Sequence, residues 1–358
     1  MNWRKIISCI AVLATSIFVI YSCQTKAIVS QKSPNDIDFG QVPYPKLSDY
    51  GFFTGELSEL VPNERVLLYQ PASTLFSDYA SKTRFVWMPE GSTASIMDND
   101  WEEIDYPQGS ILVKNFFYDN AEGARRVVET RLLVFNEGKW NAYPYLWNEE
   151  QTDADYKITG ATLPIAFTHN GKDYDINYVQ PNKNQCKSCH NQNEELKPIG
   201  PKARNMNFEL DYGNGERKNQ LLKWTEMGYL DNFTSSEDFQ SVPSYDQQDV
   251  DIADRARAYL DANCGYCHNP KSPASTSGLT LSWEESDTNK LGYWKTPVAA
   301  GLGAGSLLVD LHPGRADSSI IVHRMNSTEQ GVAMPEIGRV LIHEEGVQIV
   351  ADWINSMN

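Results

Sequence analysis

The chain of 358 residues is poor in basic side chains, with 31 Lys and Arg against 47 Asp and Glu and a formal net charge of −16. A protein that follows a phosphate backbone needs a basic face, so this balance argues against nucleic-acid binding. The sequence also lacks a Gly-rich phosphate-binding loop and a Gly-x-Ser-x-Gly nucleophile turn. Nucleotide enzymes and hydrolases of that type therefore have no support.

A long hydrophobic run is missing as well. The apolar stretch at residues 6–20 follows Arg4 and Lys5, and it is shorter than the roughly 20 residues of a membrane span. A short basic region followed by an apolar stretch of this length is typical of an export signal. Tyr21-Ser22-Cys23 follows this stretch. An ending on Ser22-Cys23 resembles a bacterial lipoprotein signal in which the Cys is lipidated; an ordinary secretory signal is the alternative. We expect a signal peptide over 1–22, lipid anchoring at Cys23 and an exported protein of the periplasm or cell envelope.

Cysteine is scarce, and its placement is informative. Of the six Cys, Cys9 lies in the expected signal and Cys23 would carry the lipid. The other four form two matching motifs, Cys186-Lys187-Ser188-Cys189-His190 and Cys264-Gly265-Tyr266-Cys267-His268. Cys-x-x-Cys-His is the attachment motif of c-type haem. Two thiols on one helical turn add to the porphyrin vinyl groups as thioethers, and the adjacent His reaches the iron. The sequence therefore predicts two covalently bound haem c groups.

Three other uses of these cysteines are less well supported. A zinc site would combine both pairs, but 74 residues lie between Cys189 and Cys264, against the roughly 15–20 of known sites. A thioredoxin-like dithiol needs one pair only and gives no reason for the two His residues. Structural disulfides suit an oxidising compartment, although a two-residue gap makes a poor cross-link.

The pattern of residues divides the chain into segments. A polar tether is expected over 23–48 and a β-rich domain over 49–180, where turn signals such as Asn170-Gly171 separate short runs of Val, Leu, Phe and Thr. Such spacing favours a β-sandwich over a parallel sheet. The expected strands cover residues 110–118, 125–135, 140–147, 163–168 and 174–179.

After residue 180 the pattern becomes helical. We expect a first haem segment over 181–245 and a cytochrome c domain with the second haem over 246–358. Apolar residues share one face of residues 251–263 and again of 343–354, which predicts a helix entering the second motif and a closing helix. The expected fold class is α+β and multidomain, with a β-sandwich-like domain, a helical haem segment and an all-α class I cytochrome c domain.

Residues 250–358 resemble a class I cytochrome c domain of the kind found in bacterial multidomain and dehydrogenase-linked cytochromes. The whole chain is similar to a sparsely characterised group of exported dihaem cytochromes with a β-rich amino-terminal region. The stretches that carry these resemblances are RARAYLDANCGYCHNP (255–270), SGLTL (277–281), HPGRADSSIIVHRM (312–325), AMPEIGR (333–339), GVQIVADWI (346–354), LFSDYASKTRF (75–85) and YPQGSILVKNFFY (106–118).

The motifs make His190 and His268 the proximal iron ligands. For the second haem the resemblance implies a distal Met from the loop before the closing helix, which is Met334; Met325, His312 and His323 are the competitors. The distal ligand of the first haem stays open among Met206, Met227, His169 and no protein ligand. Lys202 and Arg204 are candidates for pairing with haem propionates.

Electron transfer between redox partners through the two haems is the expected function. An acidic surface would attract a basic redox partner, either a dehydrogenase or another cytochrome. One alternative is a dihaem enzyme of the peroxidase type, with an open sixth position on the first haem. Another is a cytochrome subunit that serves a partner dehydrogenase through the β-rich domain. The state of the sixth position of the first haem separates the carrier from the enzyme.

Overall fold

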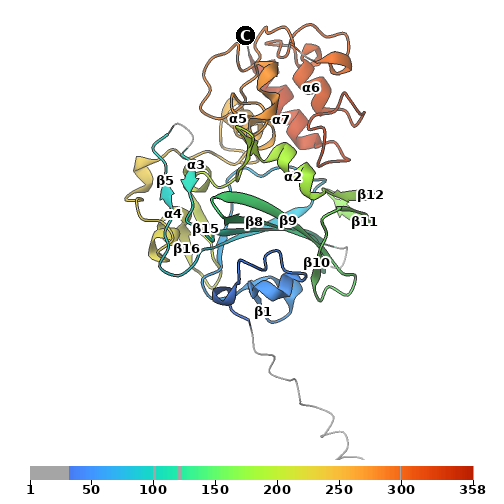
Figure 1. Cartoon of the computed structure of the whole chain (residues 1–358). Helices are drawn as coiled ribbons and strands as arrows, with labels where there is room; N and C mark the ends of the chain where they lie inside the picture. Colours follow the sequence, from blue (N-terminus) through green and yellow to red (C-terminus); the bar gives the residue numbers. More distant parts are fainter. Residues whose placement is uncertain (1–31, 100–101, 120–122, 299, 358) are drawn as a thin grey trace, which may run out of the picture. The chain divides into compact units, whose positions relative to one another are not determined.

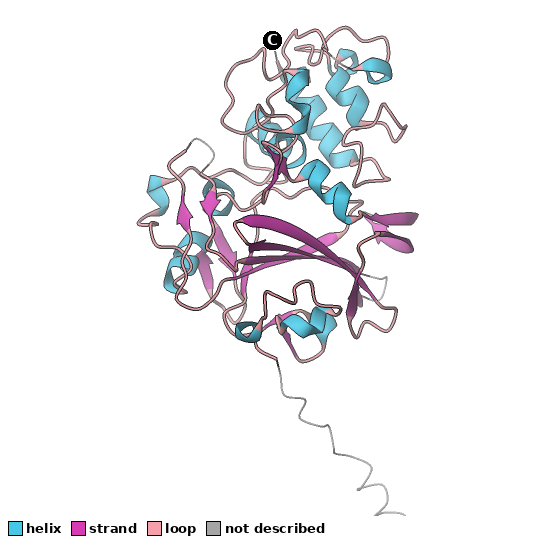
Figure 2. Cartoon of the chain, in the orientation of Figure 1, coloured by secondary structure: helices cyan, strands magenta, loops and turns pink. Residues whose placement is uncertain are grey.

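The structure is a computed structural model that describes residues 32–99, 102–119, 123–298 and 300–357. In this part of the chain strand (28%) exceeds helix (24%). Residues Ser33–Asn358 form one compact unit. An antiparallel sheet lies at its centre, and helices α2, α5, α6 and α7 lie on one side of that sheet (Figure 1, Figure 2).

The central sheet has the strand order β10-β9-β8-β7-β4-β3, with every neighbouring pair antiparallel. Its strands are β3 (Leu67–Tyr69), β4 (Ser81–Trp87), β7 (Ile111–Asp119), β8 (Arg125–Asn136), β9 (Lys139–Trp147) and β10 (Ala154–Tyr156). Strands β8 and β9 turn directly into one another because Glu137 and Gly138 adopt positive φ angles of 54° and 71°. A two-residue turn of this kind matches the twist of the strands that it joins.

Within the described residues, five smaller sheets have two strands each. Their strands are β1 (Phe53–Thr54), β2 (Val61–Pro62), β5 (Ser95–Ile96), β6 (Ile104–Asp105), β11 (Ala161–His169), β12 (Lys172–Gln180), β13 (Asn191–Gln192), β14 (Glu195–Leu196), β15 (Glu209–Asp211) and β16 (Arg217–Asn219). The predicted hairpin is confirmed as β11–β12, and its turn at Asn170-Gly171 has positive φ angles of 49° and 76°.

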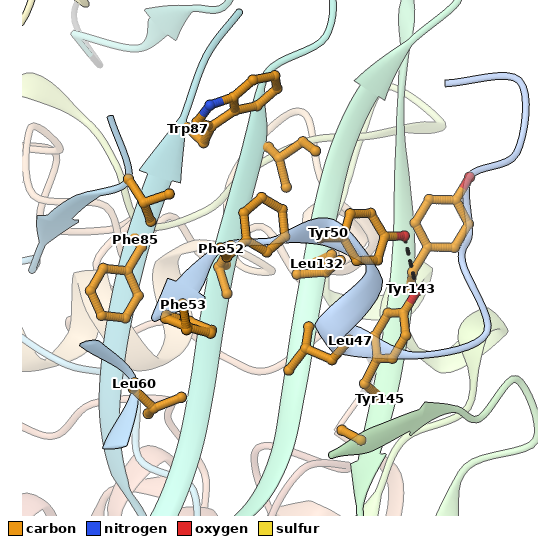
Figure 3. Close-up of a cluster of buried hydrophobic side chains, with 14 of the residues drawn as sticks. Leu47, Tyr50, Phe52, Phe53, Leu60, Phe85, Trp87, Leu132, Tyr143 and Tyr145 are labelled. Carbon is orange, nitrogen blue, oxygen red and sulfur yellow. Dashed lines mark hydrogen bonds between the residues drawn. The ribbon is translucent and has the colours of Figure 1, made fainter. Parts of the chain in front are cut away.

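One face of the central sheet is covered by the segment that precedes it. Cross-strand neighbours on this face, such as Phe85 and Val113, pack against Leu47 and Phe52 (Figure 3). The hydroxyl groups of Tyr50 and Tyr145 lie 2.9 Å apart within this cluster. Residues Ile37, Phe39 and Val42 pack against it as well. This part of the expected tether is therefore folded onto the sheet.

The opposite face meets the middle of the chain. Helices α3 (Ala203–Met206) and α4 (Gln220–Glu226) share a hydrophobic cluster with the sheet. Trp224 is fully buried there, edge-on to Tyr69 at 5.9 Å between ring centroids. The Gln220 side chain accepts a hydrogen bond from Gln70 N at 2.8 Å and donates one to Gln70 O at 2.9 Å. Residues of the first haem segment and of the β-rich region thus share a core.

The remaining α-helices are α2 (Lys183–Cys189), α5 (Ile252–Leu260), α6 (Ile320–Met325) and α7 (Glu344–Ser356). Helices α5 and α7 agree with the two predicted from apolar spacing. Asp251 caps α5, accepting a hydrogen bond from Ala253 N at 2.8 Å. Ala256 and Leu260 of α5 join Val350 and Ile354 of α7 in a third cluster.

The predicted fold class is wrong for the β-rich region. It contains one six-stranded sheet with different segments on its two faces, whereas a sandwich would need two large sheets packed together. Alternating apolar residues identify a half-buried strand but do not specify what covers it. Here the cover consists of short turns before the sheet on one face, and of helices and loops from later in the chain on the other.

The predicted all-α cytochrome c domain is also wrong. Among described residues 246–357, α-helix is confined to α5, α6 and α7. The last of these, α7, is the single helix at the C-terminal end. The long stretch between α5 and α6 forms a π-helical turn directly after α5, then loops and short 3-10 turns. Two of these turns end at Gly278 and Gly305, whose φ angles are 67° and 55°. A left-handed glycine ends a helical turn, so these segments do not grow into helices.

A buried cluster of charges joins α3 to the C-terminal region. Arg204 is 1% exposed, and its Nη2 lies 3.2 Å from Asp261 Oδ1 and 2.9 Å from Glu284 Oε2. Burial alone would raise the pKa of Asp261, but Lys202 and Arg204 together hold that pKa below its ordinary value. Asp261 is therefore ionised, and it also accepts a hydrogen bond from Trp283 N at 3.0 Å.

We expect Arg204→Met to lower the free energy of unfolding by about 3–5 kcal/mol, because it leaves two carboxylates without their shared cation. Chemical denaturation of the full chain measures this loss. Arg217→Met is the matched control, since Arg217 and Glu209 are both about two thirds exposed and 3.8 Å apart; it should change stability by less than about 1 kcal/mol. Equal effects of the two substitutions would contradict the role given to Arg204.

Candidate cofactor-binding site

The first Cys-x-x-Cys-His motif lies on α2, and a local capping pattern fixes where this helix begins. The Asn182 side chain accepts a hydrogen bond from Gln185 N, and the Gln185 side chain accepts one from Asn182 N, both at 2.9 Å. Cys186 and Cys189 are three residues apart on α2, so their side chains share one helix face. His190 follows at the C-terminal end of the helix.

The second motif follows α5 through one wider helical turn. This π-helical turn covers Asp261–Gly265 and contains Cys264. Asn269, which is 1% exposed, closes the loop that follows by donating to Gly265 O and Ser272 Oγ, both at 2.8 Å. π-Helical turns are often found at functional sites, and this one sets the direction of the chain as it enters the motif.

The two motif histidines are oriented in the same way. His190 Nδ1 lies 2.9 Å from Lys197 O, and His268 Nδ1 lies 3.2 Å from Ser277 Oγ. A carbonyl oxygen accepts only, so His190 Nδ1 carries the proton. Ser277 Oγ donates its own proton to Ala274 O at 2.7 Å, so it accepts from His268. In both rings Nε2 is then the unprotonated nitrogen, which is the arrangement of a metal-binding histidine.

Burial reinforces this protonation state. It lowers the pKa of His190 and of His268 to about 4 in each case. The Lys197 carbonyl acts in the opposite direction on His190, while the charges of Lys114 and Arg131 lower its pKa further. Both imidazoles are therefore neutral near pH 7 and available as nitrogen ligands.

The two motifs meet in space although they are far apart in the sequence. Cys267 Sγ lies 4.0 Å from Ser188 O. A hydrogen bond between the thiols of Cys189 and Cys267 lowers the pKa of Cys189 to about 7 and raises that of Cys267. All four motif cysteines are free thiols. The described residues contain no group of three or more His, Cys, Asp or Glu arranged to hold a metal ion, so they offer no preformed zinc site.

A cavity lies beside the motifs. Its empty volume, counted together with its opening to solvent, is about 1870 Å³. Apolar residues of the sheet such as Leu112, Leu133 and Ala142 form part of its wall. The sulfur and imidazole groups that line it belong to Cys186, Cys189, His190, Cys264, Met325, Met334 and His343. Cys267 and His268 do not line it.

Met334 lies in a loop that is fastened to the cavity wall. The Met334 N–H donates to Arg324 O at 3.0 Å. The Arg339 guanidinium donates through Nη2 to Met334 O and Ser327 O, both at 2.8 Å. Met325, the competing ligand, is 7% exposed and belongs to the cluster around α5 and α7, although it also lines the cavity. His312 and His323 do not line it.

The sequence-based candidates for the sixth ligand of the first haem lie away from the cavity. Met206 is completely buried in the cluster around Trp224, and Met227 packs against the same cluster. His169 sits at the end of strand β11, where its ring stacks on Tyr79 at 4.0 Å and its Nε2 lies 3.1 Å from Glu345 Oε1. None of these three residues lines the cavity.

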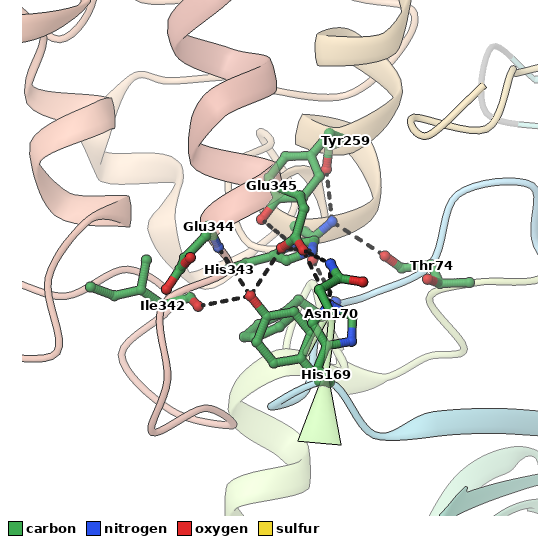
Figure 4. A network of polar contacts seen from close by, with 11 residues as sticks. Thr74, His169, Asn170, Tyr259, Ile342, His343, Glu344 and Glu345 are labelled. Atoms are coloured by element: carbon green, nitrogen blue, oxygen red, sulfur yellow. Dashed lines mark hydrogen bonds and ion pairs between the residues drawn. The ribbon is translucent and has the colours of Figure 1, made fainter. Parts of the chain in front are cut away.

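His343 lines the cavity instead, and sequence reasoning missed it. Its ring is 8% exposed and stacks on Phe76 at 4.3 Å, and its Nδ1 lies 3.1 Å from the Tyr259 hydroxyl. Figure 4 shows it beside Glu345 and the tip of the β11–β12 hairpin. Burial lowers the pKa of His343 to about 4. Its position at the start of α7 was the available signal, but one His there does not distinguish a helix cap from a cavity residue.

Comparisons with protein-family models, with curated proteins and with solved structures found no match for this chain. None of the helices in the described residues is long and apolar enough to cross a membrane. The expected signal peptide over 1–22 and the expected lipid site Cys23 lie outside the described residues.

The residues present fit a covalently attached haem. Each motif places two thiols and a neutral, oriented imidazole at the end of a helix, and Cys186, Cys189 and His190 of the first motif all line the cavity. The cavity wall combines apolar side chains with the thioether of Met334. His190, His268 and Met334 are the residues that would bind iron, and the four cysteines are those that would hold the porphyrin.

Proposed function

We propose that this protein is an exported dihaem c-type cytochrome that transfers electrons between redox partners. The observation that carries the proposal is the pair of matching Cys-x-x-Cys-His motifs, in which each His donates through Nδ1 and leaves Nε2 unprotonated. A disulfide does not explain why both histidines have this orientation, and the described residues contain no group of three or more His, Cys, Asp or Glu that could hold a zinc ion. When bound, the haem iron supplies a one-electron exchange between its ferrous and ferric states.

The chain contributes attachment, orientation and exclusion of water. The four cysteines would hold the two cofactors, and the half-buried histidines would bind the iron as neutral imidazoles. The contact between Cys189 and Cys267 supports a close approach of the two cofactors. A short path between two irons suits a protein that takes an electron on one side and passes it on at the other.

Partners and location are further parts of the proposal. The formal net charge of −16 suits a redox partner with a basic surface, either a dehydrogenase or another cytochrome. The apolar run at residues 6–20, which follows Arg4 and Lys5, supports export. Cys23, shortly after this run, supports anchoring to the cell envelope by lipid.

A second function, an enzyme with an open sixth position on the first haem, has one observation in its favour. Met206, Met227 and His169, the three candidate ligands, do not line the cavity beside His190. A peroxidase-type reaction would use that open position, and His343 is a group in the cavity wall that could exchange a proton.

The first test removes the attachment thiols of one motif at a time. Cys186→Ala with Cys189→Ala, and separately Cys264→Ala with Cys267→Ala, should each lower the intact mass by one haem and halve the haem absorbance of the denatured protein. The two double variants serve as controls for each other, because each keeps the other motif intact. Wild-type protein without covalent haem, matured in a host that attaches haem c, would contradict the proposal.

The second test concerns Met334. Met334→Ala should lower the reduction potential of one haem, because a thioether ligand stabilises ferrous iron more than water or a second imidazole does. Redox titration followed by absorbance measures this shift. Met325→Leu is the control and should leave both potentials nearly unchanged. The reverse result, with an effect of Met325→Leu alone, would assign the ligand to Met325.

Electron paramagnetic resonance of the oxidised, fully loaded protein separates the two functions. Two low-spin ferric signals mean that both irons have six ligands, as the carrier requires. One low-spin and one high-spin signal would favour the enzyme, and peroxide turnover would then be measured in wild type and in His343→Gln.

A further inference from the structure

Three cations lie side by side on the sheet face that borders the cavity. Arg84 on β4 is the cross-strand partner of Lys114 on β7, and Lys114 is the partner of Arg131 on β8. The neighbouring row, Phe85 and Val113, packs into the cluster on the other face. Because side chains alternate along a strand, the three cations point away from that cluster. All three line the cavity.

This row is electrostatically unfavourable by itself. Like charges directly opposite one another on adjacent strands destabilise a sheet. Burial, reinforced by the charges of Arg84 and Arg131, lowers the pKa of Lys114 well below its ordinary value. The ring of Phe116 offsets part of this cost, since Lys114 Nζ lies 4.8 Å and Arg131 Cζ 4.4 Å from its centroid.

Only Arg131 has a carboxylate partner in the described residues. Its Nη2 donates to Glu129 Oε2 at 2.9 Å, and the Tyr178 hydroxyl donates to the same oxygen at 2.8 Å. Arg84 is 5% exposed, and its buried Nη1 has no hydrogen-bond partner in the described residues. No ion pair among those residues includes Arg84 or Lys114. A buried guanidinium nitrogen without a partner is costly and points to an anionic ligand.

The row lies beside the first motif. Lys114 and Arg131 share the cavity wall with Cys186, Cys189 and His190. Both charges act on the pKa values of Cys189 and His190, whereas Arg339 is the cation that acts on Cys264. The sheet cations therefore face the first cofactor position, and Arg339 faces the second.

We propose that Arg84, Lys114 and Arg131 form a carboxylate-binding wall that receives the two propionate groups of the first haem. The inference rests on the proposed function. When Lys114 is protonated, the three cations carry three positive charges, and the carboxylate of Glu129 cancels one of them. The remaining two equal in number the two propionate carboxylates. Arg204, a candidate from the sequence, is instead occupied by Asp261 and Glu284, while Lys202 does line the cavity.

The wall acts on the cofactor in two ways. A guanidinium donates two parallel hydrogen bonds to a carboxylate, so Arg84 fixes the tilt of the cofactor in the cavity. Positive charge near the iron disfavours the ferric state, so the wall raises the reduction potential of the first haem. Among the described residues, the carboxylate paired with this wall is Glu129, which Arg131 already binds.

The test compares Arg84→Gln and Lys114→Gln with Arg126→Gln in the haem-loaded full chain. Arg126 is an exposed cation on β8, so its removal is the matched loss of charge. We expect both wall variants to keep two covalent haems, to lower the potential of one haem, and to shift the propionate bending band in the resonance Raman spectrum. Arg126→Gln should keep both potentials and the band close to wild type, because exposed charges are screened by salt.

Arg84→Lys keeps the charge but loses the forked geometry. It should shift the Raman band while changing the potential less than Arg84→Gln does. Should Arg84→Gln fail to fold, Lys114→Gln and Arg84→Lys carry the test, since Lys114 is only half-buried. Unchanged potentials and an unchanged band in the folded wall variants, with two haems present, would overturn the wall and leave the proposed function standing. Wild-type protein without covalent haem would overturn both.

Discussion

The cavity between the sheet and the two Cys-x-x-Cys-His motifs is the constraint on which the rest of the structure depends. Protein interiors are close-packed, and buried charges without partners cost free energy. This interior nevertheless contains an open cavity, and in the described residues the buried Nη1 of Arg84 has no hydrogen-bond partner. A ligand that binds only the folded state stabilises the protein by mass action. The proposed haem, which is apolar over most of its surface and anionic at one edge, would account for both the cavity and the cation row.

The frame around the cavity comes from distant parts of the sequence. Residues of the sheet, of α2 with the first motif, and of the loop with Met334 all line the cavity. Arg204 on α3 forms an ion pair with Asp261, which precedes Cys264 by three residues. The Tyr259 hydroxyl meets His343, which joins α5 to the start of α7. These contacts connect the segments that surround the cavity, whereas Arg84 has no ion-pair partner in the described residues.

The sequence was sufficient for features that depend on local patterns. It predicted the Asn170-Gly171 hairpin, helices α5 and α7, and the two motifs, because turn residues, apolar spacing and a five-residue motif are all local. The sequence could not predict what covers a strand, so the predicted β-sandwich was wrong. The all-α domain was inferred from two predicted helices and from the resemblance, and the glycine-ended turns after α5 exclude it. Arg84, Lys114 and Arg131 are far apart in sequence and meet only through strand register. His343 was missed for the same reason, since its cavity position depends on how α7 packs.

The two cofactor positions are unequal, and this inequality bears on the choice between carrier and enzyme. Beside the second motif the chain offers a thioether, Met334, in a loop that Arg339 holds by its backbone. Beside the first it offers a row of cations. His343 lines the same cavity, with its ring hydrogen-bonded to Tyr259 and stacked on Phe76. An axial ligand would thus set the potential at one site and fixed charge at the other. Both devices would favour ferrous iron, so both would shift the potential in the same direction, and neighbouring potentials shifted in the same direction would suit the proposed passage of an electron.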